Sequence, residues 1–109
     1  MIGTILALLP GPVLAGFVDT YASWQRLSRP EKVTYLTGAY DSLVTLGTDP
    51  QSVRDSTHFN DCVVRSRMSA GQMTTNVENF AATRPDLHGL PPQAALIQYL
   101  VQMCGSPPQ

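Results

Sequence analysis

The sequence from Cys62 to Cys104 reads CVVRSRMSAGQMTTNVENFAATRPDLHGLPPQAALIQYLVQMC and carries both cysteines of the chain at its ends. Two helical patterns lie between them: one begins at Ser69, and the other begins at Pro92 and ends at Cys104. Two cysteines on neighbouring buried elements can form a disulfide when their Cα atoms approach within about 7 Å. The stretch therefore predicts a pair of helices closed by one disulfide.

The apolar residues of both patterns recur at helical spacing. They are Met73, Val77, Phe80 and Ala81 in the first pattern, and Ala94, Ile97, Leu100, Val101 and Cys104 in the second. The pair Val63 and Val64 predicts that neighbouring Cys62 also lies near the interior. Closing a loop of roughly 40 residues would stabilise the fold by about 4 kcal/mol. Two free cysteines packed as small hydrophobic residues remain the alternative.

Short signals mark where these helices begin and end. Ser69 and Gln72 have the spacing of a capping box, in which each side chain bonds the other residue's backbone N–H. Pro85 is expected to end that helix, because proline cannot donate a backbone hydrogen bond. Pro92 opens the last helix, and Gly105 is expected to stop it.

A helix is also predicted from Ser28 to about Leu46. Ser28 and Glu31 form a second capping box, and Gly47 is placed to stop the helix in the left-handed conformation. Gly38 lies in its middle, where glycine costs about 1 kcal/mol relative to alanine. We expect a close helix crossing at Gly38 to offset that cost.

The remaining segments are shorter. A first helix from Gly16 to Leu27 is predicted from an aromatic and aliphatic stripe: Phe17, Tyr21, Trp24 and Leu27. A short helix from Asp49 to Asp55 precedes a polar stretch at residues 56–60, which we expect to be a loop. Residues 61–68 are compatible with extended structure, and residues 86–90 with another loop. The fold class is thus all-α, a small four-helix domain closed by one disulfide.

The N-terminal segment resembles a secretory leader. Residues 2–9 form an apolar run, a Pro-Gly-Pro turn follows, and the sequence fits cleavage after Ala15. No lysine or arginine precedes the run, which departs from the usual leader, and a short apolar docking segment is the alternative. The expected organisation is a signal peptide at residues 1–15 and a single helical domain at residues 16–109, in a periplasmic or secreted protein.

Charge excludes one class of partner. The net charge is −1, and the seven basic residues are scattered along the chain. Nucleic-acid binding needs a clustered basic patch that neutralises phosphates, so we expect none. No apolar run is long enough to span a membrane.

The chain offers few groups for catalysis. Its two histidines, His58 and His88, both fall in stretches expected to be polar loops. With Cys62 and Cys104 they match the ligand count of a zinc site, but the short Cys-Xaa-Xaa-Cys unit of such sites is missing. We therefore expect no enzyme activity, no catalytic residues, no metal and no cofactor.

The segment YLTGAYD, from Tyr35 to Asp41, resembles the Tyr-apolar-Xaa-Gly-Xaa-Xaa-Asp signature of Rap/Tai-type immunity proteins. These small periplasmic proteins protect bacteria from their own type VI secretion amidase effectors. The second half of the chain, through Leu100 and Cys104, is similar in layout. The motif residues are Tyr35, Gly38 and Asp41.

The resemblance implies an exported all-α domain with a disulfide between the two cysteines. It also implies a protein partner, such as a cell-wall amidase effector, and it explains Gly38 as a close crossing. Many members of the group carry a further cysteine three residues before the signature tyrosine. That position is Lys32 here, so a second disulfide is not expected.

The leading hypothesis is a non-enzymatic periplasmic interaction protein that binds and inhibits an amidase effector. Its expected contact residues lie in the two polar stretches and are His58, Asn60, Asp86 and His88. An acid-stress chaperone of the HdeA type and a structural subunit are the alternatives. A homodimer is compatible with all three.

Overall fold

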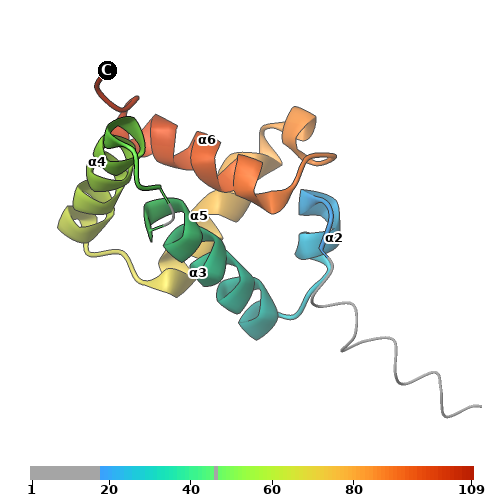
Figure 1. Ribbon diagram of the computed structural model, residues 1–109. Coiled ribbons are helices and arrows are strands. Elements are labelled where there is room, and N and C mark those ends of the chain that lie inside the picture. The colour runs from blue at the N-terminus through green and yellow to red at the C-terminus, as the bar shows by residue number, and fades with distance from the viewer. Residues whose placement is uncertain (1–17, 46) are drawn as a thin grey trace, which may run out of the picture.

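The computed structural model describes residues 18–45 and 47–109, which form five α-helices and one 3-10 turn without any strand (Figure 1). The elements are α2 (Tyr21–Gln25), α3 (Arg29–Thr45), α4 (Pro50–Ser66), α5 (Ala70–Ala82), the 3-10 turn η2 (Pro85–Leu87) and α6 (Pro92–Cys104). The predicted all-α class is confirmed. The leader prediction for residues 1–15, and Phe17, lie outside the described residues. The helix predicted from Gly16 to Leu27 is shorter than expected over its described part, because Thr20 caps its start by accepting a hydrogen bond from the Ser23 amide and only Tyr21–Gln25 is helical.

The predicted helix signals are present in the structure. Ser28 and Glu31 exchange hydrogen bonds at the start of α3, with distances of 3.0 and 3.3 Å. Ser69 and Gln72 form a second reciprocal box at the start of α5. Gly105 follows α6 at a φ of 82°, a left-handed conformation that favours glycine. Local side-chain chemistry therefore sets these helix boundaries.

The middle of the chain corrects the sequence prediction. Residues 56–60 are not a loop and residues 61–68 are not extended, because one helix, α4, runs from Pro50 to Ser66. Asp49 caps its start by accepting a hydrogen bond from the Ser52 amide at 3.2 Å. The buried stripe of α4 contains only Phe59 and Val63, and serines occupy the other positions of that stripe. Such a polar-looking face hides the helical period from a hydrophobicity pattern.

Arg67 ends α4 in a left-handed conformation, with φ at 57°. The chain then turns into α5, which packs against both α3 and α6. Gly47 does not take the left-handed conformation that was predicted for it, since Gly105 is the described glycine with a positive φ. It lies instead against the first turn of α4. A Cβ atom at Gly47 would overlap the Ser52 side chain, so this position requires glycine.

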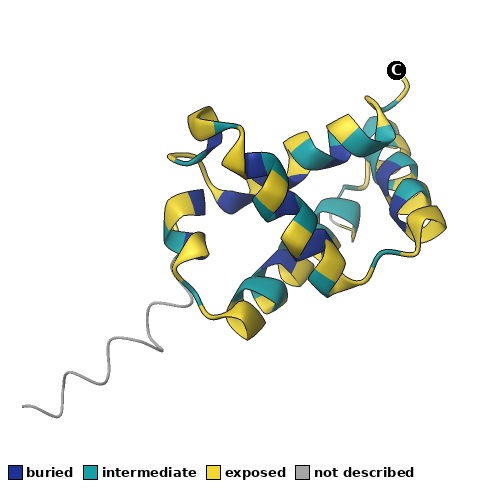
Figure 2. Ribbon diagram, turned by 180° about the vertical axis from the view of Figure 1, so that it is seen from behind, coloured by how far each residue is buried: buried dark blue, intermediate teal, exposed yellow. Residues whose placement is uncertain are grey.

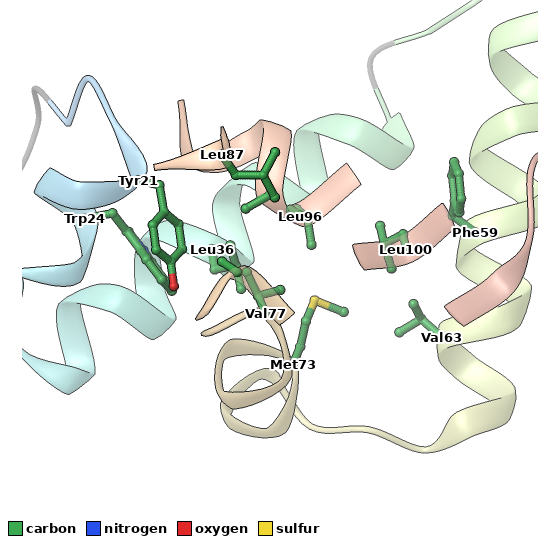
Figure 3. Close-up of a cluster of buried hydrophobic side chains, with 12 residues drawn as sticks. Tyr21, Trp24, Leu36, Phe59, Val63, Met73, Val77, Leu87, Leu96 and Leu100 are labelled. Carbon is green, nitrogen blue, oxygen red and sulfur yellow. The ribbon is translucent and has the colours of Figure 1, made fainter. Parts of the chain in front are cut away.

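The core is continuous from one end of the molecule to the other (Figure 3). Tyr21 and Trp24 of α2 fill one end, and Phe59 and Val63 of α4 fill the other. Side chains of α3, α5 and α6 connect them: Leu36, Met73, Val77, Ala81, Ala95, Leu96 and Leu100. Dark blue, buried segments lie on the sides of the helices that face one another (Figure 2).

Two apolar residues lie on the opposite side from the one predicted. Val64 is 64% exposed although its neighbour Val63 is buried, because successive residues of a helix point about 100° apart. In α6, Ala95 and Leu96 are buried, whereas Ile97 is 37% exposed. The buried face of α6 is therefore rotated relative to the prediction, and Ile97 is left at the surface.

The predicted disulfide is confirmed. Cys62 of α4 and Cys104 of α6 are bonded, with their Cα atoms 5.8 Å apart and a sequence separation of 42 residues. The bond joins α4, which buries only Phe59 and Val63 along its 17 residues, to α6, the last helix of the chain. The described part of the chain has no free cysteine.

Candidate protein-binding surface

The motif residues Tyr35, Gly38 and Asp41 lie on the outer side of α3. Tyr35 is partly buried, and its hydroxyl accepts a hydrogen bond of 3.1 Å from the Gln93 amide of α6. Gly38 and Asp41 are exposed. The structure contradicts the predicted close crossing, because a Cβ atom at Gly38 would meet nothing within 4 Å. The crossing fails because α3 buries the Leu36 side, and Gly38 lies on the other side of the helix.

Around Gly38, α3 presents a solvent-exposed surface without bulky side chains. We call this surface the α3 face; its members are Glu31, Thr34, Gly38, Asp41 and Ser42. Thr34, Gly38 and Ser42 are spaced four residues apart, so they form one row along the helix. The row leaves the backbone of α3 accessible at Gly38.

Two shallow hollows flank this row and together form what we call the α3–α6 groove. The first measures about 360 Å³ and is lined by Leu27, Pro30, Glu31, Thr34 and Tyr35. The second measures about 230 Å³ and is lined by Ala39, Ser42, Leu43, Gln93, Leu96 and Ile97. The hydrogen bond between Tyr35 and Gln93 joins one residue from each hollow. Most of the lining is apolar, which suits a partner's aliphatic or aromatic side chain.

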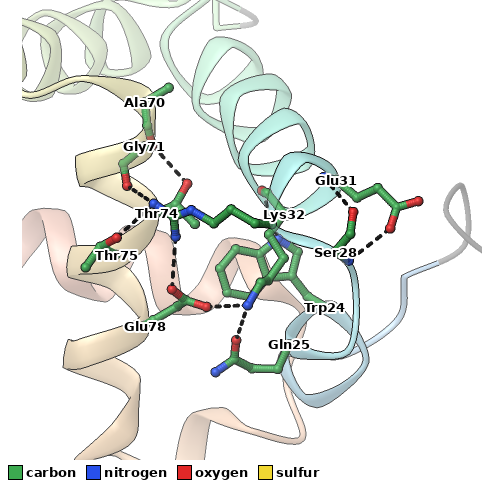
Figure 4. A network of polar contacts seen from close by, with 11 residues as sticks. Trp24, Gln25, Ser28, Glu31, Lys32, Ala70, Gly71, Thr74, Thr75 and Glu78 are labelled. Carbon is green, nitrogen blue, oxygen red and sulfur yellow. Dashed lines mark hydrogen bonds and ion pairs between the residues drawn. The ribbon is translucent and has the colours of Figure 1, made fainter.

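The charges of α3 are sorted between its two sides. Its basic residues lie on the side next to α5: Lys32 Nζ lies 2.6 Å and Arg29 Nη1 3.4 Å from the carboxylate of Glu78, with the Arg29 side chain half exposed (Figure 4). Its acidic residues, Glu31 and Asp41, are both exposed on the α3 face. Hydrogen bonds from Ser28 hold the pKa of Glu31 below its usual value. The α3 face is therefore acidic although α3 carries equal numbers of acids and bases.

Lys32 also connects α2 to this cluster. Its ammonium group donates to Gln25 at 3.2 Å and lies 5.7 Å from the centre of the Trp24 ring. The Trp24 indole N–H in turn donates to the Lys32 carbonyl at 3.2 Å. Lys32 thus joins α2, α3 and α5 by polar contacts. It is the position at which many Rap/Tai-type proteins carry a further cysteine.

The first pair of predicted contact residues, His58 and Asn60, lies on α4 rather than in a loop. His58 Nε2 is 2.9 Å from the carbonyl oxygen of Gly105, at the end of α6. Asn60 is exposed, and its Oδ1 accepts a hydrogen bond of 2.9 Å from the Tyr40 hydroxyl of α3. Both side chains therefore join α4 to its neighbours.

The second pair, Asp86 and His88, lies around η2. Two hydrogen bonds from the Arg84 guanidinium lower the pKa of Asp86, which is exposed. His88 is partly buried: its Nε2 is 2.8 Å from the Ala81 carbonyl, and its ring stacks on Tyr21 at 5.2 Å. Figure 1 places η2 and α4 at opposite ends of the molecule, so the two pairs do not form one surface.

A third hollow lies between α5 and α6. It measures about 440 Å³ and is lined by Asn79, Phe80, Thr83, Tyr99, Gln102 and Met103. The Tyr99 hydroxyl accepts from Asn76 at 3.0 Å and contacts the sulfur of Met103 at 3.2 Å. Half of its lining residues are polar and none of the motif residues reaches it, so it suits an apolar partner less well than the α3–α6 groove.

Residues 18–45 and 47–109 contain no group of three His, Cys, Asp or Glu side chains that could hold a metal ion. Cys62 and Cys104 have no thiolate to offer, because they are bonded to each other. No described helix is long and apolar enough to cross a membrane.

The residues of the α3–α6 groove and of the acidic α3 face were not predicted as a site. One signal was present in the sequence: Thr34, Gly38 and Ser42 are small and four residues apart. A second was the placement of Arg29 and Lys32 three residues apart, which puts both bases on one side of a helix. Neither signal says which side of α3 is buried.

No family model, curated protein or solved structure matches this chain. The candidate surface therefore stands on the geometry of its own residues.

Proposed function

We propose that this protein is a non-enzymatic binding protein of an oxidising compartment that recognises a protein partner through the α3–α6 groove. The observation that carries the proposal is the groove itself: two apolar hollows that α3 lines on the N-terminal and C-terminal sides of the accessible Gly38 backbone. A rigid scaffold surrounds it, because α3 and α6 both contribute to the continuous core. Apolar hollows on a rigid surface are where protein interfaces place their anchoring side chains.

The disulfide supports the compartment. Cysteine pairs persist as disulfides in the periplasm and outside the cell, and are rare where thiol reductants are abundant. A chain with both cysteines in one bond suits a periplasmic or secreted protein.

The contacts of both histidines support the absence of catalysis in this proposal. Each Nε2 lies within 2.9 Å of a main-chain carbonyl oxygen, that of Gly105 for His58 and that of Ala81 for His88. A general base needs a free ring nitrogen within reach of the substrate or of a nucleophile; Nδ1 is the nitrogen left free in each ring, and among the described residues it makes no hydrogen bond to a nucleophilic side chain. These two rings act as contacts between elements instead.

We extend the proposal to the class of partner through the motif Tyr35, Gly38 and Asp41. All three lie at the α3 surface, where a partner reaches them. Their resemblance to the Rap/Tai signature supports an immunity role, in which the protein binds and inhibits a cell-wall amidase effector.

The test begins with the exported, tagged protein. It is purified without reductant, its mature N-terminus is determined by mass spectrometry, and an amidase encoded beside its gene is titrated against it. We expect a stoichiometric complex and loss of amidase activity. Turnover of peptidoglycan fragments by the protein alone would overturn the non-enzymatic assignment, and full amidase activity in its presence would overturn the immunity role.

A further inference from the structure

Among the described residues, residues 18–45 and 47–109, no neighbouring group accounts for the glycine at position 38. Glycine in a helix interior is less favourable than alanine, and the usual compensation is a neighbouring group that needs the space. Nothing lies within 4 Å of the position that a Cβ atom would take at Gly38. No described residue supplies a compensating contact, so the backbone of α3 at Gly38 is open to the approach of another molecule.

The charge around Gly38 indicates what kind of molecule that is. Lys32 and the half-exposed Arg29 both pair with Glu78 on the α5 side of the helix, which leaves Glu31 and Asp41 as the charged residues of the α3 face. Oppositely charged surfaces steer partners together and set the register of the complex. The outward side of α3 is complementary to cations.

We propose that the α3 face and the α3–α6 groove bind a basic amphipathic segment of a partner protein. The inference rests on the proposed function and adds the partner's chemistry and register. An apolar side chain of the segment occupies the groove beside Ile97, its backbone crosses α3 at Gly38, and its basic residues lie at Glu31 and Asp41.

The spacing of the two carboxylates predicts the spacing of the bases. Glu31 and Asp41 are ten residues apart in α3, which corresponds to about 15 Å along the helix axis. An extended segment covers that distance in about four or five residues, and a helical segment in about ten. The apolar anchor lies between the two bases.

A second copy of this chain fits the surface less well. An isologous dimer places the same surface of both copies against each other. Here that would bring the acidic α3 faces together, with their exposed Glu31 and Asp41 carboxylates. The charge pattern favours a different, basic chain.

The experiment is a selection from a phage-displayed library of random 16-residue peptides on the oxidised full-length protein. We expect the enriched peptides to be basic, with two Lys or Arg residues at one of the two spacings and an apolar residue between them. Their affinity should fall as salt rises from low ionic strength to 0.5 M, because the Debye length shrinks well below 10 Å.

Variants then locate the site. Gly38→Gln should weaken the selected peptides by roughly tenfold or more, because its side chain fills the crossing point. Asp41→Lys should weaken them by about three- to tenfold, and Glu31→Gln by about threefold. Glutamine at position 31 retains the acceptor for the Ser28 N–H, so the cap of α3 is preserved.

Matched controls on α4 separate the site from general effects. Thr57→Gln and Asp61→Lys add the same side chains at exposed positions of the neighbouring helix, and both should leave affinity unchanged. Analytical ultracentrifugation of the free protein tests for self-association through this surface, and a monomer is expected.

Several results overturn the proposal: no enriched peptides, neutral or acidic peptides, equal binding to Gly38→Gln, or a dimer that Gly38→Gln dissociates. None of them removes the proposed function, which requires only that an amidase is bound and inhibited through the α3–α6 groove, whatever the charge of the segment that enters it. If the protein forms no complex with the amidase but still binds the basic peptides, the proposed function fails and the inference about the α3 face stands.

Discussion

The two ends of the core are fastened by different chemistry. At the α4 end, only Phe59 and Val63 are buried by α4, and the Cys62–Cys104 disulfide joins α4 to α6. At the α2 end, a helix of five residues is held by a large aromatic side chain and by polar contacts to Lys32.

The difference shows how burial and cross-linking substitute for each other. Trp24 is fully buried, and complete burial of a large aromatic side chain stabilises by several kcal/mol. The α4 end buries smaller apolar surface per residue of helix, so a covalent bond makes up the difference. The disulfide at the α4 end and the aromatic packing at the α2 end can be tested by separate variants.

The largest expected effect is at the covalent end. Replacing both cysteines, Cys62→Ser with Cys104→Ser, should destabilise the protein by about 4 kcal/mol, because the unfolded chain regains the freedom of a loop of 42 residues. Urea unfolding of both proteins measures the difference. Hydrogen exchange should show the loss of protection first in α4, with α3 and α5 affected less.

Reduction of the wild-type protein is the matched control, since it breaks the bond without changing the sequence. Oxidised protein should be two hydrogens heavier after reduction, and its unfolding midpoint should then approach that of the double variant. Equal stability of the oxidised and reduced forms would show that the core holds α4 without the bond.

The next effect is at the aromatic end and depends on pH. The Tyr21 hydroxyl is buried without a hydrogen-bond partner among the described residues, and burial, with a smaller effect of Glu78, raises its pKa to about 12. The unfolded tyrosine loses its proton near pH 10, so the folded state binds more protons between pH 10 and 12. Stability is therefore complete below pH 10 and should fall by about 2–3 kcal/mol as the pH rises through 12.

Tyr21→Phe is the matched variant. Without the Tyr21 hydroxyl, the loss of stability between pH 10 and 12 that this group causes should disappear. At pH 7 the variant should be as stable as the wild type or more stable by about 1 kcal/mol, because an unsatisfied hydroxyl is removed. Urea unfolding at pH 7, 9 and 11 measures both effects. A variant that is clearly less stable at pH 7 would mean that the hydroxyl is satisfied, for instance by a bound water.

A conservative change at Trp24 should cost less than loss of the disulfide. Trp24→Phe removes the indole N–H that bonds the Lys32 carbonyl and leaves unfilled volume, so we expect a loss of about 2 kcal/mol. Tryptophan fluorescence disappears in this variant, and circular dichroism therefore monitors unfolding. If the loss equals that of the double cysteine variant, the two ends contribute alike and the contrast between them fails.

The smallest effect lies between the two ends, on the α3 face. Gly38→Ala should stabilise the protein by about 1 kcal/mol, because the new methyl group meets open space and alanine favours a helix. A close helix crossing at Gly38 would instead make Gly38→Ala destabilising. A lower melting temperature for Gly38→Ala would place a neighbouring group against this position.

The candidate surface was only partly predictable. The motif from Tyr35 to Asp41 could be recognised in the sequence, but its exposure could not. A glycine in a helix has the same sequence signal whether a second helix crosses it or solvent covers it. The contact residues expected at His58 and Asn60 were assigned to a loop, because serines interrupt the buried stripe of α4.

The sequence by itself determined the starts of α3, α5 and α6, the stop of α6 at Gly105 and the disulfide partners. The boxes at Ser28 and Ser69 depend on residues only three positions apart, and two cysteines allow one intramolecular pairing. Such signals act within one helical turn, or leave no alternative partner, so they hold whatever packs around them.

Only the tertiary structure decided which side of each helix is buried. Lys32 is directed inward by Glu78, which lies 46 residues away in the sequence. That contact turns the acids of α3 outward and leaves Gly38 uncovered. Local patterns set where a helix begins and ends, whereas its orientation depends on the combined burial of partners that are distant in the chain, and no window of neighbouring residues contains them.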